Sequence, residues 1–492
     1  DDGFIQVTKD GGENWKKIPV TALGLPKRSF VNDIKADIHD ENIVYVVLDN
    51  HKEGDFNPYL FKSEDQGNTW LPISNDLPKR TLLWRIVQDH INRNLFFLAT
   101  EFGIYTSLNG GKNWQKLHGT PNMGFRDLVI QKRESDLVAA SFGRGFYVLD
   151  DYSPLRNFSS ENLKKKGHLF PIKDGKWFIP RSNLGNTGAD FYLAENPRYG
   201  VTMTYHLRDN YETKSEKRKK REKPLNQKLL NVPFPGYDEL DEEKNETPAY
   251  IKISIEDENG NIIRHLKERA AKGSNRITWD LRHMFKGSVT DSNKNYKLKG
   301  PIVKPGKYSA ALYLVKNGAT TNLSEKESFE LKPIYESTLK GTSYEDYNKY
   351  VDDYFQVYNV IESIEHKLKA IDEKVKFFKI AIENTPIDIE KLVLDFSSLR
   401  SSLLSIKRRV FGNESKSEIG EKNLPTLFNR IRVASQGLSS SYGPTKLHLE
   451  SLNMARLINK EIKPLIEELI NKKIIPLENK IKAVGGPIIL DN

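Results

Sequence analysis

Three copies of one eight-residue pattern lie in the first 114 residues, and they constrain the fold of this chain more than any other feature. Each copy has a hydroxyl residue, then Asp or Asn, then Gly, then Trp. The Asp or Asn side chain can accept hydrogen bonds from the amides of its own turn, and Gly supplies a positive φ. The pattern predicts three equivalent tight turns, the repeat turns, in which Trp packs into an apolar layer. The repeat turns are Thr8–Trp15, Ser63–Trp70 and Ser107–Trp114.

The sequence around the repeat turns recurs as well, which is typical of a β-propeller. A short apolar strand precedes each turn, and a pair of strands precedes the second and third turns and recurs after the third. The tryptophans are 55 and 44 residues apart, which fits four-stranded blades of about 40–50 residues. We therefore expect an all-β propeller region over residues 1–155. Its paired strands start at Val31, Leu83 and Phe125, with partners from Asn42, Leu95 and Asp136.

About three blades fit into residues 1–155, whereas a closed ring uses roughly four to eight. The first predicted strand, which starts at Gly3, is an outer strand of a blade. We therefore expect the C-terminal blades of an incomplete propeller, with the N-terminal remainder of the same propeller as a partner. The last unit ends over residues 143–151 with no repeat turn after it.

The repeat turns resemble the Asp-box, or bacterial neuraminidase repeat (BNR), of sialidases, some glucanases and sortilin-type receptors. The resemblance implies a propeller in which the box residues are structural and lie on the blade rim, away from the ligand site. It is specific for a fold and says almost nothing about chemistry. The box residues are Asp10, Gly12, Trp15, Asp65, Gly67, Trp70, Asn109, Gly111 and Trp114.

Charge and composition limit the classes of function. The chain has 492 residues, no cysteine and a net charge of +10. Disulfides, thiolate metal sites and cysteine nucleophiles are therefore excluded, and no apolar run is long enough to span a membrane. Residues 214–223 hold seven basic and two acidic residues, but residues 238–246 hold six acidic and one basic. We expect a solvated, self-neutralising loop here; a polyanion-binding arm is the alternative.

The middle of the chain reads as a connector over 156–190 followed by a β-domain over 191–333, which the charged insertion 209–247 interrupts. Alternating strands, a hairpin turn at Asn259-Gly260 and Trp279 as a core residue predict an immunoglobulin-like sandwich. The runs Asp257–Arg264, Gly273–Asp280 and Pro305–Tyr308 resemble the immunoglobulin-like module of flagellar hook-capping proteins.

Residues 334–492 predict an α-helical bundle of about four helices. The expected helices cover 344–383, 389–410, 424–438 and 444–484, the last with kinks at Pro464 and Pro476. Their apolar stripes are expected to form the bundle's own core; a membrane or coiled-coil partner is the alternative. Core positions include Val360 and Ile361 in the first helix and Leu449 and Leu452 in the last.

The order of these parts, with Gly143–Asp151 and Ala194–Pro197, resembles large bacterial sortilin-like proteins that carry the label glycosyl hydrolase. The resemblance covers essentially the whole chain and is specific for architecture. That label rests on propeller similarity and implies little about catalysis. The lack of cysteine departs from eukaryotic sortilins, whose propeller is followed by a disulfide-rich module.

Most of the candidate catalytic residues lie at the start of the paired strands that begin at Val31, Leu83 and Phe125, which we call the strand openings. Sialidase chemistry would need an arginine cluster, and Arg85, Arg126 and Arg144 come from successive units. Glucanase chemistry would need two carboxylates at a defined gap, and Asp33 and Asp127 occupy equivalent positions. Each residue also has a structural interpretation in strand capping or pairing, so none is assigned as catalytic. The histidines show no zinc-ligand spacing and no glycine loop binds phosphate, so we expect no metal and no cofactor.

Two hypotheses of function remain. The first is a noncatalytic binding or scaffold protein, secreted, periplasmic or on the bacterial cell surface, that recognises protein or glycan within a larger assembly. The second is a sialidase- or glucanase-like glycoside hydrolase whose active site lies mostly in the missing blades. Nucleic-acid binding is a distant third, and we expect no nucleic-acid partner.

Overall fold

The computed structural model describes residues 3–180, 188, 194–289, 299–335, 338, 340–386 and 390–489. The chain divides into two compact units. The first consists of Asp1–Pro171, Thr204–Tyr211 and Ala271–Asn275, and the second of Ile172–Met203, Glu212–Ala270 and Arg276–Asn492. The described part of the chain is mostly antiparallel β-sheet, followed by a C-terminal helical region.

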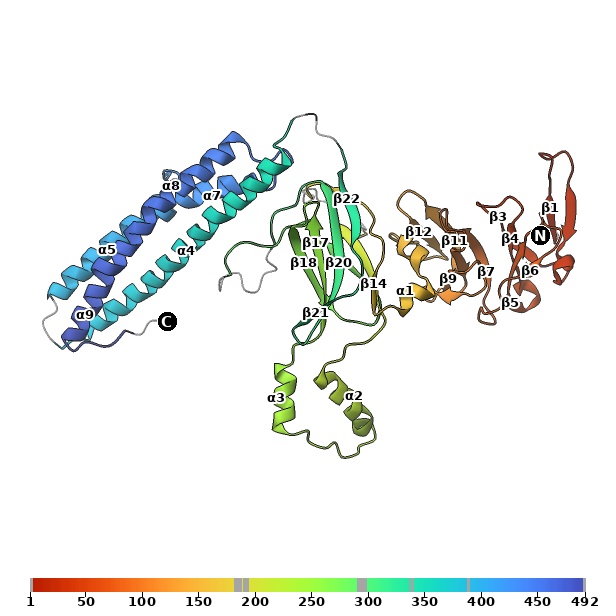
Figure 1. Ribbon diagram of the computed structural model, residues 1–492, viewed down its shortest axis with the longest axis horizontal. Helices are drawn as coiled ribbons and strands as arrows, with labels where there is room; N and C mark the ends of the chain where they lie inside the picture. The colour runs from red at the N-terminus through yellow and green to blue at the C-terminus, as the bar shows by residue number, and fades with distance from the viewer. Residues whose placement is uncertain are drawn as a thin grey trace. The chain divides into compact units, whose positions relative to one another are not determined.

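The first unit is a series of antiparallel sheets in which consecutive strands are neighbours (Figure 1). A hairpin of β1 (Phe4–Val7) and β2 (Lys16–Pro19) comes first. Two four-stranded sheets and one three-stranded sheet follow, each curled in a form compatible with propeller-like folds. Their strands are β3 (Phe30–Ala36), β4 (Val44–Asn50), β5 (Asp55–Ser63) and β6 (Leu71–Pro72); β7 (Leu83–Gln88), β8 (Phe96–Thr100), β9 (Gly103–Ser107) and β10 (Gln115–Lys116); and β11 (Phe125–Gln131), β12 (Asp136–Ser141) and β13 (Phe146–Leu149).

Successive sheets of this unit pack face to face. Strand β7 contacts β3 and β4 on one side and β11 on the other. Apolar side chains fill each gap: Tyr45 meets Phe96 between the first pair of sheets, and Phe97 meets Tyr152 beside the second pair. The strands predicted from the sequence are confirmed, and the core of the unit lies between the sheets.

The three repeat turns have the same hydrogen bonds. In the second turn, Oγ of Ser63 accepts from the Gly67 amide at 2.8 Å, and Oδ1 of Asp65 accepts from the Thr69 amide at 2.8 Å. Bonds to the turn's own amides hold the pKa of Asp65 to about 2. The predicted turn geometry is confirmed, with positive φ at the shared glycine. The equivalent bonds join Thr8 to Gly12, Asp10 to Asn14, Ser107 to Gly111 and Asn109 to Asn113.

The three tryptophans of the repeat turns do not behave alike. Trp114 is buried, and its Nε1 donates to the carbonyl of Ile73, the residue directly after β6 of the preceding sheet. Trp70 is partly buried against the core beside β1 and β2. Trp15 is 58% exposed, so its predicted place in an apolar layer is wrong. Its Nε1 donates to the carbonyl of Gly12 in its own turn at 3.0 Å, whereas that of Trp114 reaches a neighbouring sheet.

Replacing Gly67 by alanine is expected to lower the stability of the first unit by about 1–2 kcal/mol, because φ at this position is +83°. A built Cβ would also lie 3.1 Å from Cδ1 of Ile18. Urea denaturation followed by tryptophan fluorescence measures the change. Gly67→Asn separates the two causes, since asparagine tolerates this backbone conformation: an equal loss in both variants would mean that the contact, not φ, is responsible.

Two further sheets lie in the middle of the chain. One has the order β14 (Gly167–Leu169), β16 (Val201–Leu207), β19 (Gly273–Trp279). Trp279 of β19 is fully buried and contacts the rings of Tyr308 and Phe329 from the other sheet, which confirms it as a core residue. That sheet has the order β15 (Gly175–Trp177), β22 (Glu327–Pro333), β20 (Gly306–Lys316), β17 (Tyr250–Asp257), β18 (Ile262–Arg269), with β21 (Ala319–Asn322) on β20.

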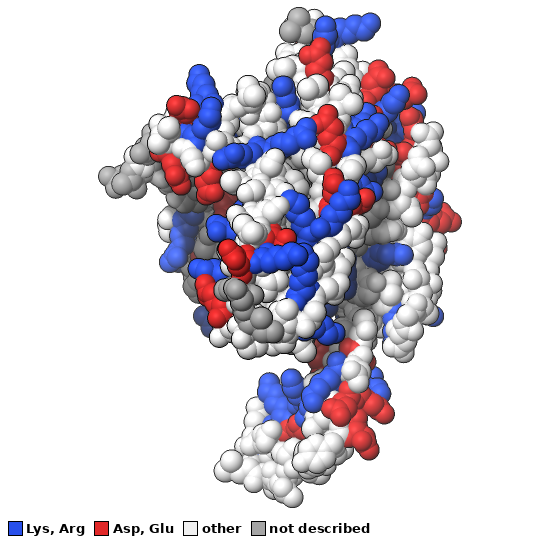
Figure 2. All heavy atoms as spheres, turned by 90° about the vertical axis from the view of Figure 1, so that its left-hand side faces the viewer, with Lys and Arg blue, Asp and Glu red and all other residues white. Residues whose placement is uncertain are grey.

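The charged insertion is helical, so its assignment as a loop is wrong. Helix α2 (Lys214–Gln227) carries the basic run and α3 (Tyr237–Asn245) the acidic run. Thr213 and Glu216 form a capping box that starts α2. Nε of Arg218 lies 2.7 Å from Glu243, so the two runs neutralise each other as predicted. Figure 2 shows the opposite charges gathered on the two sides of this segment.

The C-terminal region is a bundle of long helices, with α4, α5 and α8–α9 side by side (Figure 1). Helix α4 has the predicted bounds, but Val360 and Leu449 are exposed, which corrects the predicted core. Helix α8 runs through Pro464 without interruption, and a π-helical segment, Ile470–Ile474, joins it to α9 just before Pro476. Ile389 lies outside the described residues. The helices are α4 (Tyr344–Glu383), α5 (Glu390–Phe411), α6 (Glu414–Glu418), α7 (Leu427–Gln436), α8 (Lys446–Leu469) and α9 (Ile475–Ala483).

Candidate binding site at the strand openings

The first strand of each sheet in the first unit has an irregularity at the same place. Pairing shifts register between Val31 and Asp33, between Leu83 and Arg85, and between Phe125 and Asp127. A bulge of this kind turns a side chain out of the regular alternation and is frequent beside functional sites. Asn32, Trp84 and Arg126 are the residues within the shifts, and each is followed by a charged residue.

Arg85 joins two of the candidate carboxylates in one ion-pair bridge. Its Nη1 lies 2.9 Å from Oδ1 of Asp33, and its Nε lies 2.8 Å from Oδ1 of Asp127. Asp33 also accepts from the amide of Ile86 at 3.1 Å. Its side chain is 3% exposed, against 48% for Asp127. The three residues come from β3, β7 and β11, so the bridge ties three sheets together and occupies both carboxylates.

Arg126 belongs to a second group at the same end of the sheets, which we call the Trp84 cluster: Trp84, Glu101, Arg126 and Phe142. The guanidinium carbon of Arg126 lies 3.5 Å from the centre of a Trp84 ring and 4.9 Å from that of Phe142. Glu101 accepts from Nε1 of Trp84 at 3.1 Å and lies 3.6 Å from Nη2 of Arg126. Phe142 is 71% exposed. The cluster therefore offers solvent an aromatic face beside a cation and an anion.

The structure brings together four of the five candidate site residues in these two groups. Arg144 is the exception: it is exposed in the β12–β13 turn between two glycines with positive φ. The sequence reasoning missed Trp84, Glu101 and Phe142. A signal for Trp84 was present, because it stands at the position of Arg126 in the aligned strand openings. Glu101 and Phe142 lie in the turns after β8 and β12 and carry no such signal.

A buried ionic group lies at the opposite end of the second sheet. Asp89, which is fully buried, accepts from Nε and Nη2 of Arg156 at 2.9 and 2.8 Å and from the hydroxyl of Tyr152 at 2.7 Å. The amide of Asn92 donates to it at 2.7 Å. Burial raises the pKa of this carboxyl, but these hydrogen bonds outweigh burial and lower it to about 2. The group anchors the 3₁₀ turn Ser153–Asn157 and is structural.

No other feature of the described residues points to metal or membrane chemistry. They contain no group of three or more His, Asp or Glu side chains that could hold a metal ion. Among the helices that the structure describes, none combines the length and apolar composition needed to cross a membrane.

Comparison with known proteins gives only weak likenesses. No protein-family model matches the sequence, and no curated protein matches it. The extracellular domain of a protein described as a one component system from B. thetaiotaomicron is 13% identical, over 68% of this chain and 36% of that one, with a TM-score of 0.21. An ancestral GH74 enzyme is 14% identical over 69% of this chain and 39% of its own, with a TM-score of 0.25.

A third solved structure, the GH74 enzyme of Niastella koreensis, is 15% identical over 59% of this chain and 38% of its own, with a TM-score of 0.21. The chain thus spans between 36% and 39% of the length of these three proteins. At such TM-scores the likenesses carry no argument about function, which has to come from the residues themselves.

Proposed function

We propose that this chain is a noncatalytic glycan-binding protein of the bacterial envelope or of a secreted assembly, and that the Trp84 cluster is its binding site. The sheets β3–β6, β7–β10 and β11–β13 are successive blades of a β-propeller with Asp-box turns over residues 1–155. The strands within 191–333, together with β14 and β15 from the segment 156–190, form an immunoglobulin-like sandwich with the insertion 209–247, and 334–492 is a helical bundle. The residues between, 156–190, connect propeller and sandwich.

The observation that carries this proposal is the chemistry of the Trp84 cluster. A sugar ring has an apolar face and a polar edge, and sites with a few placed polar groups beside aromatic rings suit such ligands. Phe142 offers a ring open to solvent, while Glu101 and Arg126 offer an acceptor and donors beside it. The bulge at Arg126 supports the site, since it sets this side chain against Trp84.

The bridge through Arg85 argues against catalysis by the candidate residues. A glycoside hydrolase needs two carboxyl groups about 5–10 Å apart that are free to face the substrate. Asp33 is buried and bound to Arg85 and to the Ile86 amide, and Asp127 binds the same guanidinium. Glycoside hydrolysis, the alternative, would therefore have to use carboxylates other than this pair.

Isothermal titration with a panel of oligosaccharides, a neutral β-glucan and an acidic glycan, tests the proposal on the full chain. At least one member is expected to bind, and Phe142→Ala is expected to weaken that binding about tenfold through loss of a stacking contact. Ile91→Ala is the matched control, because Ile91 is equally exposed but lies at the opposite end of the second sheet. The variant should bind like the original chain.

Two results would contradict the proposal. Release of reducing sugar from a bound oligosaccharide would favour the hydrolase. Equal binding by Phe142→Ala and the original chain would place the glycan site elsewhere.

A further inference from the structure

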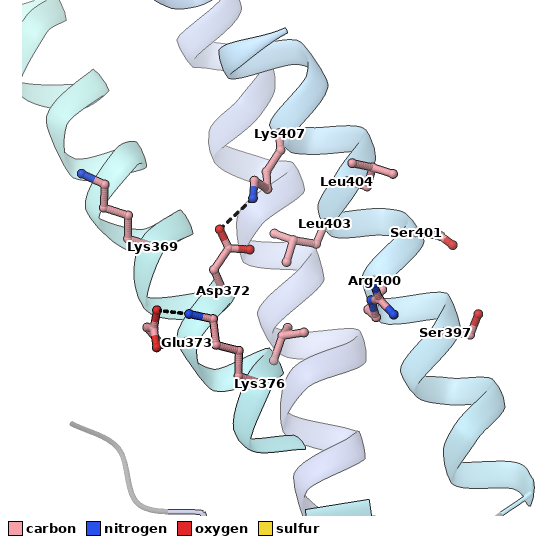
Figure 3. A pocket seen from close by; sticks show the side chains of 11 residues that line it. Lys369, Asp372, Glu373, Lys376, Ser397, Arg400, Ser401, Leu403, Leu404 and Lys407 are labelled. Carbon is pink, nitrogen blue, oxygen red and sulfur yellow. Dashed lines mark hydrogen bonds and ion pairs between the residues drawn. The ribbon is translucent and has the colours of Figure 1, made fainter. Parts of the chain in front are cut away.

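A groove lies between α4 and α5 in the helical bundle, apart from every residue discussed above. Its volume is about 780 Å³, and all eleven lining residues belong to these two helices (Figure 3). Its apolar part consists of Val375, Leu403 and Leu404. Leu403 is buried, whereas Leu404 is 48% exposed. The groove therefore has an apolar floor that stays open to solvent.

The groove continues as an apolar strip beyond its lining residues. Residues three or four apart share one helix face. One turn beyond Lys376 on α4 lies Ile380, and one turn before Ser397 on α5 lie Val393 and Leu394; all three are exposed. Exposed apolar side chains that gather in a strip mark interaction surfaces more often than scattered ones do.

The rim of the groove carries an excess of positive charge. Four lining residues are cationic, Lys369, Lys376, Arg400 and Lys407, and two are acidic, Asp372 and Glu373. Glu365 of α4 pairs with Lys369 at 2.7 Å, so the excess is about one positive charge. Lys407 reaches across from α5 to Asp372 at 2.8 Å, and Lys376 pairs with Glu373 on its own helix (Figure 3). Arg400 takes part in none of the ion pairs between described residues; it stacks beside Phe396 on α5.

We propose that this groove, the α4–α5 groove, binds an amphipathic helix with acidic flanks from a partner protein. The side-chain ridges of the neighbouring helices α4 and α5 leave a groove between them, and a third helix can pack its own side-chain ridge into such a groove. The apolar floor fits the partner's stripe, and the cationic rim fits carboxylates beside that stripe. A polyanion such as nucleic acid would use the rim but not the floor. The proposal does not depend on the ligand of the Trp84 cluster.

The test uses the full chain and a fluorescein-labelled helical peptide with Leu at i, i+3, i+4 and i+7 and Glu at the flanking positions. Fluorescence anisotropy is expected to show saturable binding that weakens as salt rises. A peptide with Lys in place of Glu should bind at least about tenfold more weakly. A peptide of the same composition without the apolar stripe should behave likewise.

Variants locate the binding. Leu404→Glu and Arg400→Glu are each expected to weaken peptide binding about tenfold, because they remove an apolar contact and an attractive charge. Both side chains are exposed, so the bundle should keep its circular dichroism spectrum. Lys446→Glu and Leu447→Glu, exposed positions on α8, are the matched controls and should leave binding unchanged.

Three outcomes would overturn the proposal. The first is no binding of the acidic peptide, and the second is equal loss in the groove variants and the α8 controls. The third is displacement of the peptide by heparin together with no effect of Leu404→Glu, which would mean that the surface recognises charge alone.

Discussion

Arg156→Ala is expected to lower the free energy of unfolding of the first unit by about 3–5 kcal/mol, because it leaves the fully buried carboxylate of Asp89 without its cation. The remaining partners are neutral donors, Tyr152 and the amides of Ile91 and Asn92, and His90 at 3.5 Å, whose pKa burial lowers. Urea denaturation followed by tryptophan fluorescence measures the loss. Hydrogen exchange resolved by peptide over β7 and β8 assigns it to this unit.

The pH dependence of stability identifies the cause. The pKa of Asp89 is about 2 in the folded chain and near 3.8 in the unfolded one. The unfolded chain therefore binds the proton first, and stability is lost as the pH falls from about 4 through 2, by about 2 kcal/mol. Without Arg156, burial raises the pKa of Asp89 instead, so the variant should lose less stability on acidification than the original chain, with the part due to Asp10 and Asp65 remaining.

Arg133→Ala is the control, since Arg133 is 79% exposed and its ion pair with Glu134 lies at the surface. Its stability should change by about 0.5 kcal/mol or less. If Arg156→Ala were as mild as Arg133→Ala, or kept the acid sensitivity of the original chain, Asp89 would not depend on Arg156 for its charge.

The repeating part of the fold could be predicted because its signals are local. Each repeat turn carries its own hydrogen-bond acceptor and its own glycine, so Asp65 and Gly67 report the turn without knowledge of the rest of the chain. The 40-residue helix α4 follows from its apolar period in the same way. Burial is less local: Trp15 and Trp114 have the same sequence context, but the indole of Trp114 bonds to Ile73 beside a neighbouring sheet and that of Trp15 bonds within its own turn.

The helices of the charged insertion show a signal that was present but outweighed. Thr213 and Glu216 have capping-box spacing, but a loop was predicted because the charges of the two runs offset each other. The dense like charge of α2 is relieved by pairing with α3, where Glu243 meets Arg218 from 25 residues earlier. Local propensity cannot report a partner so distant in sequence.

The candidate site was predicted in part, and the missing part is tertiary. Asp33 and Asp127 were recognised as equivalent in sequence, but Arg85, which stands at the same position of the middle strand, was grouped with other arginines and not with its two partners. Arg85 of β7 forms ion pairs with Asp33 of β3 and Asp127 of β11. Equivalent positions of the repeat therefore carry opposite charges that pair with one another, and not three groups of one kind. Glu101 and Phe142 join Arg126 through turns between later strands, which no spacing in the sequence reveals.

Arg85→Ala is expected to destabilise the first unit by about 2–4 kcal/mol. The variant leaves the carboxylate of Asp33, 3% exposed, with the Ile86 amide and a longer ion pair, at 3.8 Å, to the half-exposed Lys35. The value lies below that for Arg156 because the side chain of Arg85 is itself partly exposed. Hydrogen exchange of the β3 and β7 amides, together with urea denaturation, measures the effect.

Asp127→Asn is the matched control for the bridge. Its side chain is 48% exposed, so this change should cost about 1 kcal/mol or less. Adding Asp33→Asn to Arg85→Ala should restore part of the lost stability, because it removes a buried charge that keeps only the longer ion pair with Lys35. If the two single variants cost the same, or if the second change made the loss larger, Asp33 would not depend on Arg85. The pair Asp33 and Asp127 would then be free to act as carboxylates, and the case for a noncatalytic site would lose its main support.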